Sequence, residues 1–575
     1  MELYSYHVFL FPFQWQFANK EMRNKTIEER TCLKELIALF ENTSWKRNEY
    51  KINTVLNYNE YNYYYSMVRE VLFDEGKDLE KSIIANLSYD IPPDTYTYKF
   101  KVCTDGYKKI YRTYSLHIDS IILHLYSTGV GVLSFHLNNR LKEQSFPEDI
   151  LNINQAGRRL YPPFFGIDSN LVGTQAQFDC KDFSGGLDVV KTKELATEFL
   201  LFNDAIYEDF RAYRDPENFS DNPFQIPNHL SYLFQGIPFT VDRSDFKKDE
   251  KKIFINPLLD DRMFVVCWYG NDYLVKEFEL NDEKHGRSRN GKLIYETKDW
   301  WYKFMFNDQK EPTCQNQKMR QDLVKKHTYK RWSDYGTLYG VNRYAFVCLT
   351  GSLEHLKKPW INASFLVNHM QTMYYKMAEL CLVQRACILR FSDEVAGISA
   401  MKDNKKIALT ERVGNLNKQY LRFVNRIYFR EVTAQEQGIE LYDMMQEHMK
   451  IGINVKDLDH EIQELHSYVS LIQEQKQNRN IELLTIIGAL FILPSFINGF
   501  FGMSILPSQT DLHISFGKLI LLLSPIILTL CGIILLLNLQ QKRKWNFKWA
   551  PIIIITILIT LGLIVWIGCF VMNIF

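Results

Sequence analysis

One face of the segment 480–504 carries residues that could line a water-filled pore. Small and apolar residues recur there at steps of three and four, which places them on one side of a helix: Ile481, Leu484, Gly488, Ile492, Ser495, Gly499 and Gly502. The later residues are small and suit a wet lumen, whereas the earlier bulky ones suit a hydrophobic constriction that closes by dewetting. Packing of membrane helices through glycine explains the same spacing, so the residues alone leave both interpretations open.

A second group of residues has the chemistry to hold an anionic ligand. Arg158 and Arg159 precede Tyr161 and two prolines in GRRLYPP; paired guanidinium groups grip phosphate bidentately, and the tyrosine ring can stack on a base. Asp215 and Asp221 lie in a proline-bounded loop and could bind ribose hydroxyls or an ammonium group. The alternatives are arginines in surface ion pairs and aspartates that cap turns.

Two further basic segments are interpreted as surface features. The run KHGRSRNGK at 284–292 is typical of an exposed turn, and the basic residues of 318–331 suit a solvated helix face. The formal net charge of +1 argues against a nucleic-acid-binding protein, which would be strongly basic. Because Walker, G-x-S-x-G and HExxH motifs are absent, we predict no catalytic residues and no cofactor. The sequence assigns no certain metal site, and Mg²⁺ or another cation is considered only as a permeant ion. The ten cysteines include no CxxC pair and are expected to be reduced thiols.

Three uncharged apolar stretches close the chain, at about 483–506, 519–539 and 549–574. Each is near or above the roughly 20 residues that span a bilayer as a helix. The sequence therefore predicts an all-α transmembrane domain over 481–575, with the lipid bilayer as a partner.

Charge in the loops predicts the orientation of these segments. The loop after the second segment carries four basic residues, Lys542, Arg543, Lys544 and Lys548, and no acidic one. Loops of this kind stay in the cytoplasm. The large N-terminal part is therefore expected in the cytoplasm, at the inner membrane, with Phe575 outside.

Two other domains are predicted before the membrane. Residues 361–480 read as a helical stalk with helices at about 363–400, 407–451 and from 454 onward, and breaks at 402–406 and 452–454.

Residues 1–360 alternate strand and helix signals and are predicted to form an α/β or α+β sensor domain. The N-terminal residues are expected to be a strand. The stretch Ser115–Leu137 is predicted to be a hairpin. A second hairpin is predicted for Phe264–Leu280, with Gly270-Asn271 as its turn. Lys191–Ala212 is predicted to be a helix.

The segment NIELLTIIGALFILPSFINGFFGMS at 480–504 resembles the first transmembrane helix of the CorA family of divalent-cation channels. The matching residues are Leu484, Thr485, Pro494, Phe496, Ile497, Gly499, Gly502 and Met503. The resemblance implies a homopentamer, a stalk helix that moves the gate, and a polar ring from Asn478 at the cytoplasmic mouth.

Ser504 departs from the family pattern, which ends in Gly-Met-Asn. In the family this Asn forms an outer ring that accepts hydrogen bonds from the water shell of Mg²⁺, an ion that dehydrates reluctantly. A serine hydroxyl is shorter and both donates and accepts. The departure implies a wider and less selective pore.

A large aromatic-rich domain before such a pore, together with Ser504, looks like the CorA-like membrane effectors of type III CRISPR systems. That resemblance implies an ion channel opened in antiviral defence by a nucleotide second messenger, a conjugate of S-adenosylmethionine and AMP. Two alternatives stay open: a Mg²⁺ transporter of the CorA family, and a membrane-anchored enzyme.

Overall fold

The structure is a computed structural model. It describes residues 2–22, 25–73, 82–105, 110–160, 196–202, 206–209, 227–259, 262–283, 294–309, 311–352, 365–401 and 406–504. Tyr161, Asp215, Asp221 and the second and third predicted membrane segments lie outside these residues.

Strand β1 (Ser5–Ala18) is the centre of the fold and is buried along its whole length. It pairs with β6 (Val130–Asn139) on one side and β11 (Phe264–Gly270) on the other. Its odd-numbered side chains, from Phe9 to Phe17, belong to one large hydrophobic core, while its even-numbered ones face the opposite side of the sheet. A strand that is apolar on both faces needs covering layers on both.

In the described residues fourteen strands form one mixed sheet, whose main path runs β12-β13-β14-β11-β1-β6-β5-β4-β7-β8. The pairs β11–β14 and β9–β10 are parallel and the other pairs are antiparallel. The remaining strands are β2 (Trp45–Arg47), β3 (Ile84–Tyr89), β4 (Thr97–Asp105), β5 (Ile110–Tyr126), β7 (Ala196–Leu201), β8 (Ile206–Asp209), β9 (Phe239–Thr240), β10 (Lys252–Pro257), β12 (Thr328–Tyr329), β13 (Leu338–Val341) and β14 (Ala345–Thr350).

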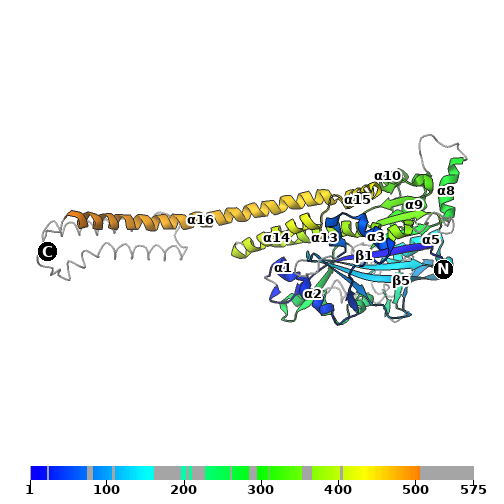
Figure 1. Cartoon of the computed structure of the whole chain (residues 1–575), viewed down its shortest axis with the longest axis horizontal. Coiled ribbons are helices and arrows are strands. Elements are labelled where there is room, and N and C mark those ends of the chain that lie inside the picture. Colours follow the sequence, from blue (N-terminus) through cyan, green and yellow to red (C-terminus); the bar gives the residue numbers. More distant parts are fainter. Residues whose placement is uncertain are drawn as a thin grey trace, which may run out of the picture. The chain divides into compact units, whose positions relative to one another are not determined.

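Helices cover both faces of this sheet (Figure 1). On the odd-residue face of β1 lie α2 (Leu33–Phe40), α5 (Pro147–Gly157) and α9 (Asp299–Phe306). On the other face lie α12 (Phe365–Gln371) and α13 (Met373–Ser399), which contact β1. The arrangement agrees with the expected α/β or α+β class. Further helices are α1 (Ile27–Arg30), α3 (Val55–Tyr63), α4 (Ser66–Leu72), α7 (Asn228–Leu233), α8 (Asp272–Glu283) and α10 (Gln317–His327), with 3-10 turns η2 (Lys142–Gln144), η7 (Arg243–Lys247), η8 (Ile294–Thr297) and η9 (Ser333–Tyr335).

The predicted first strand and the predicted hairpin at Ser115–Leu137 are confirmed. Strands β5 and β6 pair antiparallel around a turn in which Gly129 has φ +79°. Only glycine adopts this backbone conformation without strain.

Two local predictions were wrong. Residues after Gly270 do not return as a strand, because the Asn271 side chain accepts a hydrogen bond from the Leu274 N–H at 2.9 Å and caps the start of α8. The helix expected at Lys191–Ala212 is instead the antiparallel hairpin β7–β8 where the structure describes it. Strand β7 pairs with β4, so the hydrogen-bonding edge of the sheet overrides helix propensity.

The predicted stalk is helical, with different breaks. The helix expected at 407–451 is two helices, α14 (Lys406–Arg426) and α15 (Glu436–Met449). The break expected at 452–454 was wrong: it falls at Lys450, which adopts φ +56°, and α16 (Ile451–Ser504) begins at the next residue. Met449 and Ile451 are buried on either side, so packing fixes the turn at the lysine rather than at Gly452.

The chain divides into two compact units, Met1–His466 and Ser467–Phe575. The predicted boundaries at 360 and 480 remain predictions. No helix within the described residues combines the length and the apolar character that a bilayer span requires. The first predicted membrane segment overlaps α16 as far as Ser504.

Candidate functional site

Helix α16 presents an uncovered apolar face. Ile481, Leu484 and Ile492 are 59%, 67% and 68% exposed, and Gly488 and Ser495 on the same face are also exposed. By contrast, Leu483 and Ile486 on another face are partly buried. An exposed contiguous apolar stripe indicates a binding surface, because water-facing helices carry polar residues there.

The described backbone places all nine predicted pore residues on this one helix. Asn478 lies six residues before Leu484 and is exposed, so it occupies the same helix nearer its start. Gly499, Gly502, Met503 and Ser504 form the last described turns of α16. Leu484 and Ile492 are about 12 Å apart along the axis, which is enough for two successive apolar rings. One helix cannot enclose a lumen, so a pore built from this face needs several copies of the chain.

The predicted ligand arginines are not surface residues. Arg158 caps the C-terminal end of α5 and is 4% exposed; its Nη2 donates to Gln155 Oε1 at 2.8 Å. Arg159 is 6% exposed, and its backbone pairs with that of Arg262 in an isolated antiparallel β-bridge. Neither arginine is therefore at the surface, as the ion-pair alternative had placed it. Because Tyr161, Asp215 and Asp221 lie outside the described residues, the ligand role of this cluster stays a prediction.

Arg158 lies near a polar segment that the sequence analysis missed. Burial raises the pKa of the Asp308 carboxyl, while hydrogen bonds from Thr313 and the charge of Arg158 act in the opposite direction. Asn307 is 1% exposed, and both atoms of its amide lack a hydrogen-bond partner within the described part of the chain. No motif in the sequence marks residues 307–309, which are buried where α9 ends.

The basic run 318–331 is tied to the helical region of the same chain. It begins in α10, and Arg331 at its end forms ion pairs of 2.7 Å with Glu436 and with Glu440, both in α15. The expectation of a solvated helix face holds for much of α10, whose side chains are largely exposed.

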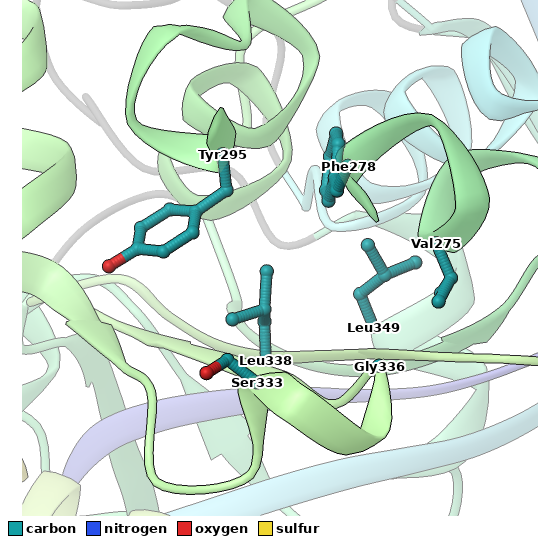
Figure 2. Close-up of a pocket in the computed structure, with 7 residues that line it drawn as sticks. All are labelled: Val275, Phe278, Tyr295, Ser333, Gly336, Leu338 and Leu349. Carbon is teal, nitrogen blue, oxygen red and sulfur yellow. The ribbon is translucent and has the colours of Figure 1, made fainter. Parts of the chain in front are cut away.

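A small apolar pocket lies beside the edge of the sheet (Figure 2). Val275, Phe278, Leu338 and Leu349 form its apolar wall, while the hydroxyl groups of Tyr295 and Ser333 point away from that wall. Its volume of about 30 Å³ has room for about two water molecules. The pocket is therefore too small for a nucleotide.

Comparisons with known proteins connect the helical region to one family. Residues 392–538 match the family model described as "CorA-like Mg2+ transporter protein". No curated protein matches the chain. A solved structure, the CorA magnesium transporter from Methanocaldococcus jannaschii, aligns at 11% identity over 51% of this chain and 96% of that chain, with a TM-score of 0.18. Over residues 392–538, which include α14, α15 and α16, the chain is thus similar to the CorA-like Mg2+ transporter family.

Proposed function

We propose that this chain is the subunit of a CorA-type cation channel in which α16 lines the pore. The observation that carries the proposal is the exposed apolar face of α16, which lies inside the segment that matches the family. Several copies, five by resemblance, would bring these faces together around one axis. The bilayer would hold the chain at the inner membrane, with the large N-terminal unit in the cytoplasm and the C-terminus outside.

The proposed gate is a hydrophobic constriction. Rings of Leu484 and Ile492 would exclude water while they are close together, and ions cannot cross a dry segment. A small rotation or spreading of α16 would wet the constriction. Ser504 would stand at the outer mouth, where its short hydroxyl recognises a hydrated divalent ion less well than an amide does.

The finer proposal is that a nucleotide second messenger opens this gate in antiviral defence. Its support is the size and aromatic content of the N-terminal unit, which exceeds what sensing of a permeant ion needs, and the serine at 504. The messenger proposed is the S-adenosylmethionine–AMP conjugate. Its phosphodiester keeps a negative charge at cellular pH, so cationic residues are expected at its site.

A second candidate is a Mg²⁺ transporter that works without a messenger, and the description of the matching family favours it. Reconstituted liposomes distinguish the two. With the full-length chain in the bilayer, a messenger-gated channel is expected to pass several cations only after the conjugate is added. A flux restricted to Mg²⁺ and indifferent to the conjugate would establish the transporter instead. Absence of any flux would refute both.

A further inference from the structure

A cavity of about 910 Å³ lies in the unit Met1–His466, between the N-terminal helices and α14. Its walls come from residues 28–38 around α1 and α2, from residues 82–83 before β3, and from the β5–β6 turn at Ser127 and Thr128. The last wall is the C-terminal part of α14 from Gln419 onward, together with Ile427 just after it. These elements lie at the same end of the sheet (Figure 1). The volume is in the range that holds a small molecule of nucleotide size.

Two arginines of α14 line this cavity in ion pairs that a ligand could replace. Arg422 contacts Glu28 at 2.8 Å and Arg426 contacts Glu70 at 3.3 Å. All four side chains are about half exposed, and ion pairs at that exposure add little to stability. A phosphate group offers more acceptor oxygens than either carboxylate, in a geometry that suits guanidinium groups.

A buried positive charge stands next to the same wall. Arg390 of α13 is 2% exposed, and its Nε and Nη2 have no hydrogen-bond partner within the described residues. Its guanidinium packs so closely on Gly129 that a side chain there would meet Nε at 2.5 Å. Gly129 follows Thr128 directly, and Thr128 lines the cavity.

Within the described residues no carboxylate forms an ion pair with that buried arginine alone. Glu394 and Asp393 act on it through their charge, and Glu394 is already shared by Arg30 at 2.9 Å and Arg412 at 2.8 Å. An uncompensated buried cation is costly. An anion in the cavity would lower that cost through the field across the Ser127–Gly129 turn.

We propose that this cavity binds a phosphate-bearing ligand of nucleotide size, with Arg422 and Arg426 as its phosphate contacts. Arg390 is assigned a supporting role, since it acts through the field rather than by contact. The apolar lining, which includes Leu33 and Phe423, would hold the uncharged part of the ligand. The inference rests on the proposed ligand-gated channel and adds the place of regulation. Helix α14 is followed by α15 and α16, so a ligand that replaces the ion pair between α14 and α1 acts on the helical path to the pore.

The test is a calorimetric titration of the full-length protein in detergent, with AMP and adenosine as probes. We expect wild-type protein to bind AMP and to bind adenosine at least about 10-fold more weakly, because only AMP carries the phosphate. The Arg422→Ala/Arg426→Ala variant should bind AMP about 100-fold more weakly. Ala38→Trp, which fills the cavity without removing charge, should also abolish binding.

Two controls isolate the cavity. Arg331→Ala removes an arginine that also pairs with two glutamates but lies away from the cavity, so it should bind AMP normally. Unchanged AMP binding by Arg422→Ala/Arg426→Ala, or no AMP binding by the wild-type protein, overturns the site. Loss of AMP binding in Arg158→Ala/Arg159→Ala together with full binding in the Arg422→Ala/Arg426→Ala variant also overturns it and places the ligand at α5.

The proposed channel is tested separately in the same variant. Leu484→Asn added to Arg422→Ala/Arg426→Ala should conduct ions in liposomes without any ligand, because the pore is independent of the cavity. Conduction together with normal AMP binding rejects the cavity and keeps the channel. No conduction by this variant, together with no conduction by the wild-type protein after the conjugate is added, rejects the channel itself.

Discussion

Ser504 carries a hydroxyl where the CorA pattern has an amide, and in the proposed channel we expect this difference to affect ion selectivity. The amide oxygen of asparagine reaches further and accepts hydrogen bonds from the coordinated water of Mg²⁺. We therefore expect Ser504→Asn to shift the flux through reconstituted channels toward Mg²⁺ relative to monovalent cations. Ser504→Thr, which keeps the hydroxyl, is the control. Equal selectivity in all three proteins would remove residue 504 from the filter.

Replacing glycine by alanine is expected to have opposite effects on stability at two positions. A methyl group at Gly131 would meet the ring of its cross-strand partner Phe13 at 2.4 Å, whereas one at Gly414 in α14 meets nothing within 4 Å. Gly131→Ala should therefore lower the free energy of unfolding by about 1–3 kcal/mol. Gly414→Ala should raise it by about 0.5–1 kcal/mol, because alanine loses less backbone entropy in a helix. Denaturant unfolding measures both, and the same sign for the two variants would contradict the packing described.

The stability of the fold should depend on pH because two of its histidines are buried. Burial lowers the pKa of His7 to about 4 and that of His136 to about 3. Below the ordinary value of about 6.5, the unfolded chain binds protons that the folded chain does not. Stability should thus be level above pH 6.5 and fall by about 1 kcal/mol per histidine for each pH unit below it.

Thermal unfolding at pH 7.5, 6.5 and 5.5 measures this slope. His136→Gln should flatten it, and replacing the exposed His460 of α16 by Gln should not. A slope that is the same in both variants would show that His136 is protonated in the folded protein.

At the scale of elements, the sequence predicts what local residues decide. The first strand, the β5–β6 hairpin and the helical character of 365–504 follow from alternation, turn residues and periodicity. The predictions fail where long-range packing determines the structure. Residues of β7 and β8 form a hairpin because β7 pairs with the edge of β4. Lys450 adopts the positive φ because Met449 and Ile451, on either side of it, are buried. The candidate sites differ in the same way. The apolar face of α16 could be predicted from its periodic spacing in the sequence. The cavity beside α14 could not, because its lining residues are hundreds of positions apart.

The proposed gate is formed by successive turns of α16 rather than by a single residue. Replacing Leu484 or Ile492 by Asn puts a polar ring where water must be excluded, so the closed channel should become wet. Expression of either variant should stop cell growth without any signal, while Leu484→Val, which stays apolar, should be tolerated. Growth assays with matched expression levels measure this. Normal growth of both asparagine variants would place the gate elsewhere.

At the scale of the whole molecule, the chain joins a large mixed sheet to a helix that continues from one compact unit into the other. The sheet is covered on both faces, and α13 packs against its strands β1 and β6. Helices α14 and α15 lie between α13 and α16 in the chain. In the proposed channel, a ligand bound against α14 would act on α16 through α15, which joins them along the chain.

Cysteine substitution along α16 tests that central claim most directly. Leu484→Cys and Ile492→Cys proteins are reconstituted in liposomes and treated with a charged, water-soluble thiol reagent, with wild-type protein and Leu483→Cys as controls. Because Leu484 and Ile492 are exposed and Leu483 is partly buried, we expect the reagent, added to channels opened with the conjugate, to block ion flux only in the first two variants. Unimpaired flux in Leu484→Cys and Ile492→Cys, or an equal block in Leu483→Cys, would contradict a pore lined by this face of α16.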